Sequence, residues 1–102
     1  MSKLGDTFHI EMLQIYHQAK KHCNYNATRF YQMVNEKGGL ATAKALLASQ
    51  EIQSGLTTLW ECGRLDLSME ALVIDPRFEQ LFSEDELEGA RKRLVAYGYS
   101  DS

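Results

Sequence analysis

Residues 6–23, with the sequence DTFHIEMLQIYHQAKKHC, carry the pattern that decides the fold. Their apolar side chains recur at intervals of four and three residues, at Phe8, Met12, Ile15, Ala19 and Cys23. This spacing places them on one face of an α-helix, and Ile10, Leu13 and Tyr16 widen that face. We expect this amphipathic helix, the longest in the chain, to organise the packing of the others.

Shorter helices are expected after this one, and glycine or capping residues mark their ends. Asn24 or Asn26 is predicted to cap a helix that ends at the glycine pair 38–39. An alanine-rich helix over residues 40–49 follows, and its small side chains favour close approach of a neighbouring helix. Residues 50–55 form the most polar connection, where we expect a mobile loop.

Capping residues and a proline also mark the helix ends in the second half of the chain. Asp66 or Ser68 is predicted to cap one helix, and Pro76 to start the next, because proline is tolerated in a first turn. Ser83 and Glu86 have the spacing of a capping box, which predicts the start of the final helix.

The length and composition suit one compact domain. The chain has 102 residues, of which 44% are hydrophobic and 25% charged, so a single helical domain over residues 1–102 can build its own core. The periodicity is helical almost throughout. We therefore predict an all-α fold, a compact array of six or seven short helices.

Charge is distributed unevenly along the chain. Residues 1–51 carry a net charge of +2 and residues 52–102 carry −5, for a total of −3 and an isoelectric point of about 5.5. An acidic protein has no bulk attraction to phosphate, which argues against nucleic acid as the default partner.

Residues 59–72, LWECGRLDLSMEAL, form the strongest local pattern. A helix that ends at Gly63, a turn of about four residues and a newly capped helix predict a helix-turn-helix-like corner. The first side chains of the second helix are acidic or apolar, whereas DNA readout needs Arg or Lys there. Arg64 either projects as a contact residue or, as we favour, fixes the corner by pairing with one of three carboxylates: Glu61, Asp66 or Glu70.

Basic and aromatic residues gather near the junction of the first two helices: His17, Lys20, Lys21, His22, Tyr25, Arg29 and Tyr31. Such a mixture is typical of single-stranded nucleic-acid sites, but also of a solvated helix edge, which we favour in an acidic protein. The basic run at 91–93 is expected on the solvated face of the last helix. Aromatic and arginine side chains dominate interface energetics. The candidate interaction residues are therefore Lys21, Tyr25, Arg29 and Tyr31 on this edge, or Trp60, Glu61, Arg64 and Asp66 at the corner.

Catalytic and metal-binding patterns are weak. The three histidines, His9, His17 and His22, lack the spacing that places two imidazoles on one side of a helix. The sequence shows neither a Ser/His/Asp ordering nor a glycine-rich phosphate loop. We expect no enzymatic activity, no cofactor and no metal.

The two cysteines and the apolar runs bear on the compartment. Cys23 and Cys62 are far apart and in no Cys-x-x-Cys frame, so we expect reduced thiols buried in the core. The first residues lack the apolar run of a signal peptide, and the longest apolar run, residues 71–74, is too short to span a membrane. The sequence therefore predicts a cytoplasmic protein without a membrane segment.

Residues 24–94 resemble a small all-helical domain of unknown function that is common in bacteria. The resemblance rests on YNATRF at 25–30, the glycine pair 38–39 with Ala43, Lys44 and Leu47, LWECGRLDLS at 59–68, EAL at 70–72, and LFS at 81–83 with Glu86, Ala90 and Leu94. Such domains are free-standing or appended to larger proteins, some of them nucleic-acid-processing or restriction-type enzymes. The resemblance implies an accessory module without assigned catalytic residues.

The sequence thus predicts a non-catalytic protein-interaction or accessory module in a bacterial or phage cytosolic complex, with a protein as its partner. The alternative is an accessory nucleic-acid-binding protein of a defence or regulatory system. Self-association through an exposed apolar stripe stays open.

Overall fold

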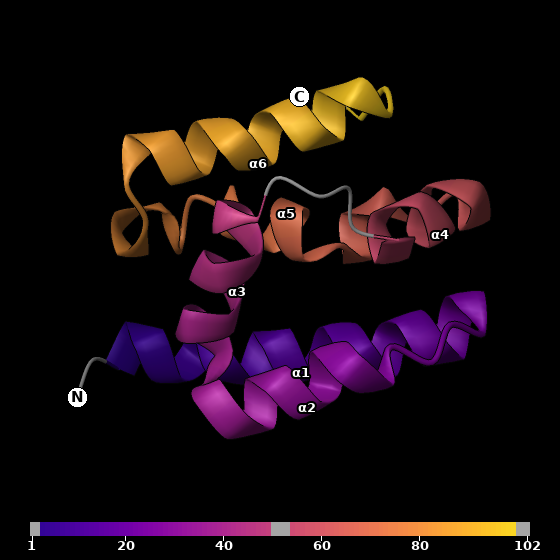
Figure 1. The fold of residues 1–102 in the computed structure, drawn as a ribbon, viewed down its shortest axis with the longest axis horizontal. Coiled ribbons are helices and arrows are strands. Elements are labelled where there is room, and N and C mark those ends of the chain that lie inside the picture. Colours follow the sequence, from indigo (N-terminus) through magenta and orange to yellow (C-terminus); the bar gives the residue numbers. More distant parts are fainter. Residues whose placement is uncertain (1–2, 50–53, 100–102) are drawn as a thin grey trace.

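The computed structural model describes residues 3–49 and 54–99, and all regular elements within them are helical (Figure 1). In chain order these are α1 (Lys3–Cys23), α2 (Thr28–Lys37), α3 (Gly39–Ala48), α4 (Ser54–Cys62), the 3-10 helix η1 (Leu65–Leu67), α5 (Met69–Val73), the 3-10 helix η2 (Glu79–Leu81) and α6 (Glu84–Ala96). The predicted all-α array of short helices is confirmed. None of the helices in these two ranges combines the length and apolar character needed to cross a membrane.

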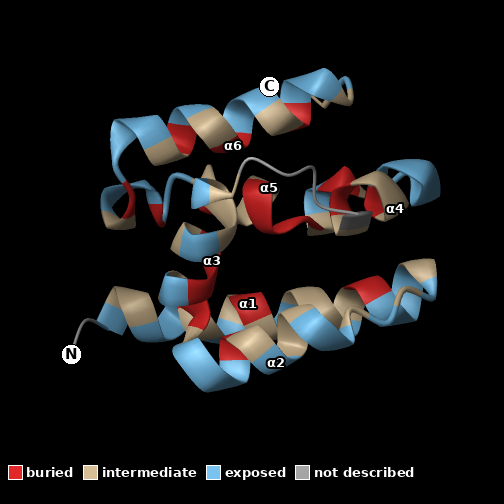
Figure 2. Ribbon diagram, in the orientation of Figure 1, coloured by how far each residue is buried: buried red, intermediate tan, exposed pale blue. Residues whose placement is uncertain are grey.

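The helices α1 and α2 form one layer, and α3 joins this layer to the other helices. Figure 1 shows α1 and α2 side by side along one edge of the molecule, α6 along the opposite edge, and α4 and α5 between them. α3 crosses from the α1–α2 layer towards α6 and contacts α1, α2 and α6. Buried residues gather where the helices face one another (Figure 2).

α1 supplies the centre of the core, as its periodicity predicts. Phe8 and Met12 are fully buried, and the Phe8 ring meets Phe78 and Phe82 edge to face at centroid distances of 5.2 and 5.4 Å. Ile10, which was expected to widen the apolar face, is 58% exposed. The buried stripe is therefore narrower than the sequence indicates.

α1 and α3 cross at a glycine. A Cβ atom on Gly39 would lie 2.7 Å from the Cα atom of His9, so only glycine permits this approach. The Gly39 amide donates a hydrogen bond of 2.9 Å to Nδ1 of His9. His9 thus caps the first turn of α3 from a neighbouring helix, because the first amides of a helix have no partner within it.

Two predicted caps are confirmed. Ser68 Oγ accepts a hydrogen bond from the Ala71 amide at the start of α5. At the start of α6, Ser83 and Glu86 form the capping box, and Glu86 also accepts a bond of 2.7 Å from Lys44 of α3. Burial raises the pKa of Glu86, but the hydrogen bonds from Lys44 and Ser83 outweigh it and hold that pKa below its usual value.

Two other helix starts differ from expectation. Neither asparagine caps α2, because Ala27 is its N-cap residue and Asn26 instead accepts a hydrogen bond from the Tyr16 hydroxyl. After α5, Asp75 accepts the Arg77 amide at 2.9 Å, as a helix cap would, but a turn at 76–78 and the 3-10 helix η2 follow in place of the predicted helix. The expected mobile loop lies mostly at residues 50–53, outside the described residues.

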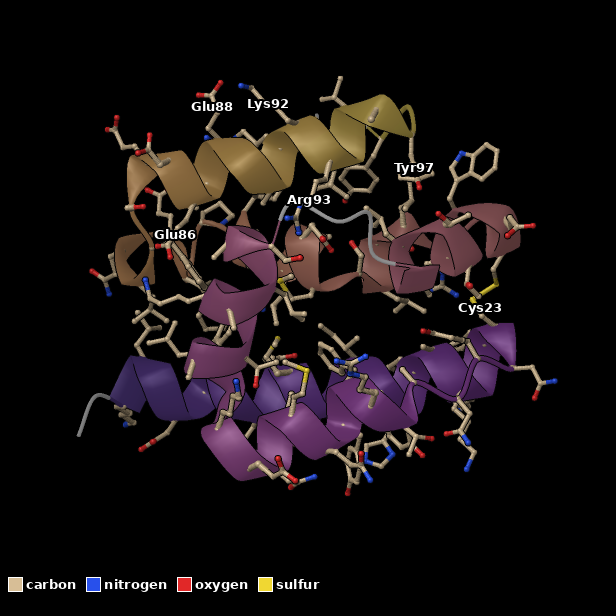
Figure 3. The ribbon with its side chains drawn as sticks, in the orientation of Figure 1. Cys23, Glu86, Glu88, Lys92, Arg93 and Tyr97 are labelled. Atoms are coloured by element: carbon tan, nitrogen blue, oxygen red, sulfur yellow. A yellow bond between two sulfur atoms is a disulfide. The ribbon has the colours of Figure 1, made fainter. Side chains whose placement is uncertain are left out.

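The expectation of two reduced, buried thiols is wrong. Cys23 and Cys62 form a disulfide, with their Cα atoms 5.8 Å apart, and Cys62 is exposed while Cys23 is half-buried. The two residues are 39 positions apart and share no sequence motif. Only the tertiary fold, which brings the last residues of α1 and α4 together, reveals their pairing (Figure 3).

Candidate functional site

A cleft of about 390 Å³ lies between the α1–α2 layer and the helices α4 and α5. Apolar side chains from all of these helices and from α3 line most of it: Ile15, Ala19, Phe30, Met33, Leu46, Leu56, Leu59 and Met69. Two of them are methionines, whose flexible side chains adapt to ligands of different shape. Its volume lies within the range of small-ligand and side-chain pockets.

Tyr25 and Arg29, two of the sequence-predicted contact residues, belong to this cleft. Arg29 is exposed, so its guanidinium lies at the rim, and in the described part of the chain it forms no ion pair. Tyr25 is half-buried, and its hydroxyl lies 3.1 Å from where a Cβ atom on Gly55 would be. Within the described residues, the cleft is thus a mainly apolar surface with an arginine outside any ion pair at its edge.

A buried carboxylate, Glu70, forms part of the cleft wall. It is 3% exposed, and its Oε2 atom accepts a hydrogen bond of 3.2 Å from Nη1 of Arg93. Arg93 also donates to the backbone oxygens of Leu47 and Ser49 at the end of α3. Arg93 therefore neutralises the buried carboxylate in the cleft wall, and its hydrogen bonds link α6 to α3 and α5 (Figure 3).

This pair corrects the expectation that the whole basic run 91–93 is solvated. The Arg93 side chain is only 21% exposed, although Lys92 beside it is 77% exposed. The sequence gives no sign of this pair, because the burial of Glu70 beside Met69 and Val73 arises only in the fold, where a buried charge needs a partner.

The remaining members of the basic and aromatic edge do not join the cleft. Tyr31 stacks on Tyr16, with ring centroids 4.3 Å apart, and the His17 ring meets Tyr31 edge-on at 5.9 Å. Lys21 is exposed near the end of α1. The predicted edge therefore divides into a cleft part, with Tyr25 and Arg29, and a separate aromatic cluster that includes Tyr31.

The helix-turn-helix-like corner is held by the favoured ion pair. Arg64 binds Asp66 through two hydrogen bonds, of 3.1 and 3.2 Å. The hydrogen bond from Arg64 holds the pKa of Asp66 below its usual value. Trp60 is 49% exposed and lies 5.6 Å from the Tyr97 ring, while Glu61 is exposed beside it.

The disulfide places this corner next to the end of α1. Cys62 directly follows Glu61, and Cys23 directly follows the basic residues Lys20, Lys21 and His22 in the last turn of α1. The charge of His22 also contributes to the lowered pKa of Asp66, in addition to Arg64 and against the effect of burial. The basic and aromatic edge and the helix-turn-helix-like corner, which are predicted as alternative interaction surfaces, are therefore neighbours.

Within residues 3–49 and 54–99, no three His, Cys, Asp or Glu side chains are grouped so that they could hold a metal ion. Comparisons of the chain with protein-family models, with curated proteins and with solved structures found no match.

Proposed function

We propose that this protein is a non-catalytic interaction module that binds a segment of a partner protein in its cleft. The partner segment presents an apolar side chain to the cleft and an acidic residue to Arg29. The observation that carries this proposal is the cleft of about 390 Å³, lined mainly by apolar side chains with an exposed arginine at its rim that forms no ion pair with any described residue.

The lining explains why a side chain of a partner would enter. Burial of an apolar side chain removes its surface from water and stabilises the complex by about 1.5–3 kcal/mol. Met33 and Met69, on opposite walls, can adjust to its shape. Glu70 does not repel a nearby carboxylate, because Arg93 already neutralises it.

Arg29 explains the preference for an acidic neighbour. A cation at the rim of an interface orients a partner and raises the rate of encounter more than it raises affinity. The guanidinium also suits a carboxylate geometrically, since it can donate two parallel hydrogen bonds.

Among the described residues that line the cleft, the one carboxylate is Glu70, and it is hydrogen-bonded to Arg93. A general acid or base must be within reach of a substrate proton. The lining therefore favours binding over catalysis. The resemblance to an accessory bacterial domain points the same way, and we place the module in a cytoplasmic complex.

A random peptide library displayed against the folded protein tests this proposal. We expect selected peptides to share an apolar residue beside Asp or Glu, and titration calorimetry to show about tenfold weaker binding to an Arg29→Ala variant. The same loss is expected when the peptide carboxylate is changed to its amide, and the two changes together should cost no more than either alone.

Two further variants complete the design. Met33→Trp fills the cleft and is expected to abolish binding, whereas Lys37→Ala removes an exposed cation from the same helix outside the cleft and should leave binding unchanged. Peptides that bind Arg29→Ala and Met33→Trp as tightly as the original protein would contradict the proposal.

An accessory nucleic-acid binder is the second candidate. It is favoured by the exposed cations Lys20 and Lys21 on α1, close in sequence to the aromatic pair of Tyr16 and Tyr31. This candidate predicts that a mixed-sequence oligonucleotide binds at low salt and is released steeply as salt rises. An oligonucleotide whose fluorescence anisotropy does not change at low salt excludes it.

A further inference from the structure

We propose that the Cys23–Cys62 disulfide is a reversible thiol–disulfide exchange site that clamps one end of the cleft, with a dithiol reductant as its reaction partner. Its effect on binding rests on the proposed function, whereas its effect on α4 does not. Oxidised, the bond holds the two walls of the cleft at a fixed separation. Reduced, it releases α4 from α1.

The position of the bond carries the first step of the proposal. Cys23 ends α1, which contributes Ile15 and Ala19 to one wall of the cleft. Cys62 ends α4, which contributes Leu56 and Leu59 to the other wall. Ala19 lies about one helical turn from Cys23, and Leu59 less than one turn from Cys62. The covalent bond therefore joins the walls at the edge of the apolar lining (Figure 3).

α4 contacts α1 and η1, and its side chains also contact the residue that follows α6. Thr57 shares a hydrogen bond with the hydroxyl of Tyr97, and the Trp60 ring lies against the ring of the same tyrosine. Tyr97 directly follows α6, as Figure 3 shows. When the disulfide opens, these contacts still hold α4 to Tyr97, so we expect the largest change at the cleft.

Exposure makes the exchange chemistry accessible. Cys62 is exposed and Cys23 half-buried, so an incoming thiolate reaches the Cys62 sulfur first. It forms a mixed disulfide there while the Cys23–Cys62 bond breaks and Cys23 leaves as a thiolate that takes up a proton. The second thiol of the reductant then attacks the mixed disulfide and releases Cys62. Two electrons and two protons pass to the protein, and the dithiol becomes a disulfide.

The proposed cytoplasmic location gives this chemistry its significance. Disulfides in reducing compartments are rare, and those that form are usually transient, catalytic or redox-sensing. An exposed disulfide that joins two walls of a binding cleft fits the redox-sensing class.

Hydrogen exchange of the oxidised and the reduced protein tests the clamp without any partner. We expect treatment with excess dithiothreitol to accelerate the exchange of the α4 amides at least tenfold more than that of the α6 amides, because loss of the cross-link destabilises the whole fold but opens α4 first. A Cys23→Ala, Cys62→Ala variant should match the reduced protein and should not respond to the reductant. Equal acceleration of exchange in α4 and α6 would overturn the proposal. So would unchanged α4 rates, or a disulfide that the dithiol does not reduce in the folded protein.

The selected peptide then separates this proposal from the proposed function. We expect its affinity to fall about tenfold on reduction, and to be restored when the protein is reoxidised. An identical affinity in both redox states would show that the disulfide does not control binding in the cleft. If no peptide binds either form and α4 still responds to reduction, the proposed function fails while the exchange site stands.

Discussion

At the scale of single residues, α1 and α3 approach closely where they cross at Gly39. A methyl group there would meet the backbone of His9, which cannot move without displacing α1. We expect Gly39→Ala to lower the free energy of unfolding by about 1–3 kcal/mol, measured by urea denaturation. Gly89 of α6 is the matched control, because a Cβ atom there meets nothing within 4 Å. Gly89→Ala should be neutral or stabilise by up to about 1 kcal/mol.

Arg93 gives a second test at this scale. Arg93→Ala leaves the buried carboxylate of Glu70 without its cation, and we expect a loss of about 3–5 kcal/mol in the free energy of unfolding. Replacing both charges, as in Glu70→Leu with Arg93→Met, should recover most of that loss. Lys92→Ala, in the exposed pair with Glu88, should change stability by less than about 1 kcal/mol. Similar losses for Arg93→Ala and Lys92→Ala would argue against a buried ion pair.

The capping box links stability to pH through Glu86. The folded-state pKa of this group is lowered, so the stability it contributes is present above its unfolded pKa, near 4.5, and is lost as pH falls through the folded value. We expect Glu86→Gln to destabilise the protein at neutral pH, and its effect to shrink as pH falls below about 4.5 and through the lowered folded-state pKa, where the carboxylate becomes protonated. An equal effect of the substitution at neutral and at acidic pH, in urea denaturation, would contradict this assignment.

At the scale of elements, the disulfide between α1 and α4 is the strongest single constraint. Because it closes a loop of 39 residues, its removal is expected to lower the free energy of unfolding by about 4 kcal/mol. Denaturation of the Cys23→Ala, Cys62→Ala variant measures this loss. Small domains have about 5–15 kcal/mol of stability, so the variant should still fold. A difference below about 1 kcal/mol would show that the bond constrains little of the unfolded chain.

The sequence predicts those elements whose signals are local. α1 follows from its apolar periodicity, and the capping box at Ser83 and the cap at Ser68 follow from side chains that bond amides two or three residues ahead. The predicted cap of α2 was wrong because Asn26 accepts a hydrogen bond from Tyr16, ten positions away. At Asp75 the side-chain cap is present, although a turn and η2 follow it in place of a longer helix. A distant partner, which the sequence does not reveal, explains the difference at Asn26.

At the scale of the whole molecule, the candidate site was predicted only in part. Tyr25 and Arg29 were proposed as contact residues because aromatic and arginine side chains dominate interfaces, and both line the cleft. The cleft itself could not be predicted, because its walls come from α1 to α5 and depend on how these helices cross. The Glu70–Arg93 pair and the disulfide were missed for the same reason, since their partners are 23 and 39 positions apart.

The disulfide also divides the chain into a closed ring and two open arms. Residues 23–62, with α2, α3 and α4, form the ring, while α1 and the segment from η1 to α6 are the arms. If the two termini are pulled apart, only the arms can lengthen fully. The oxidised chain is therefore shorter than the reduced chain at full extension by roughly 130 Å, given about 3.4 Å for each residue that the ring holds back. In mechanical terms, one two-electron reaction changes how far this protein can stretch between two attachment points.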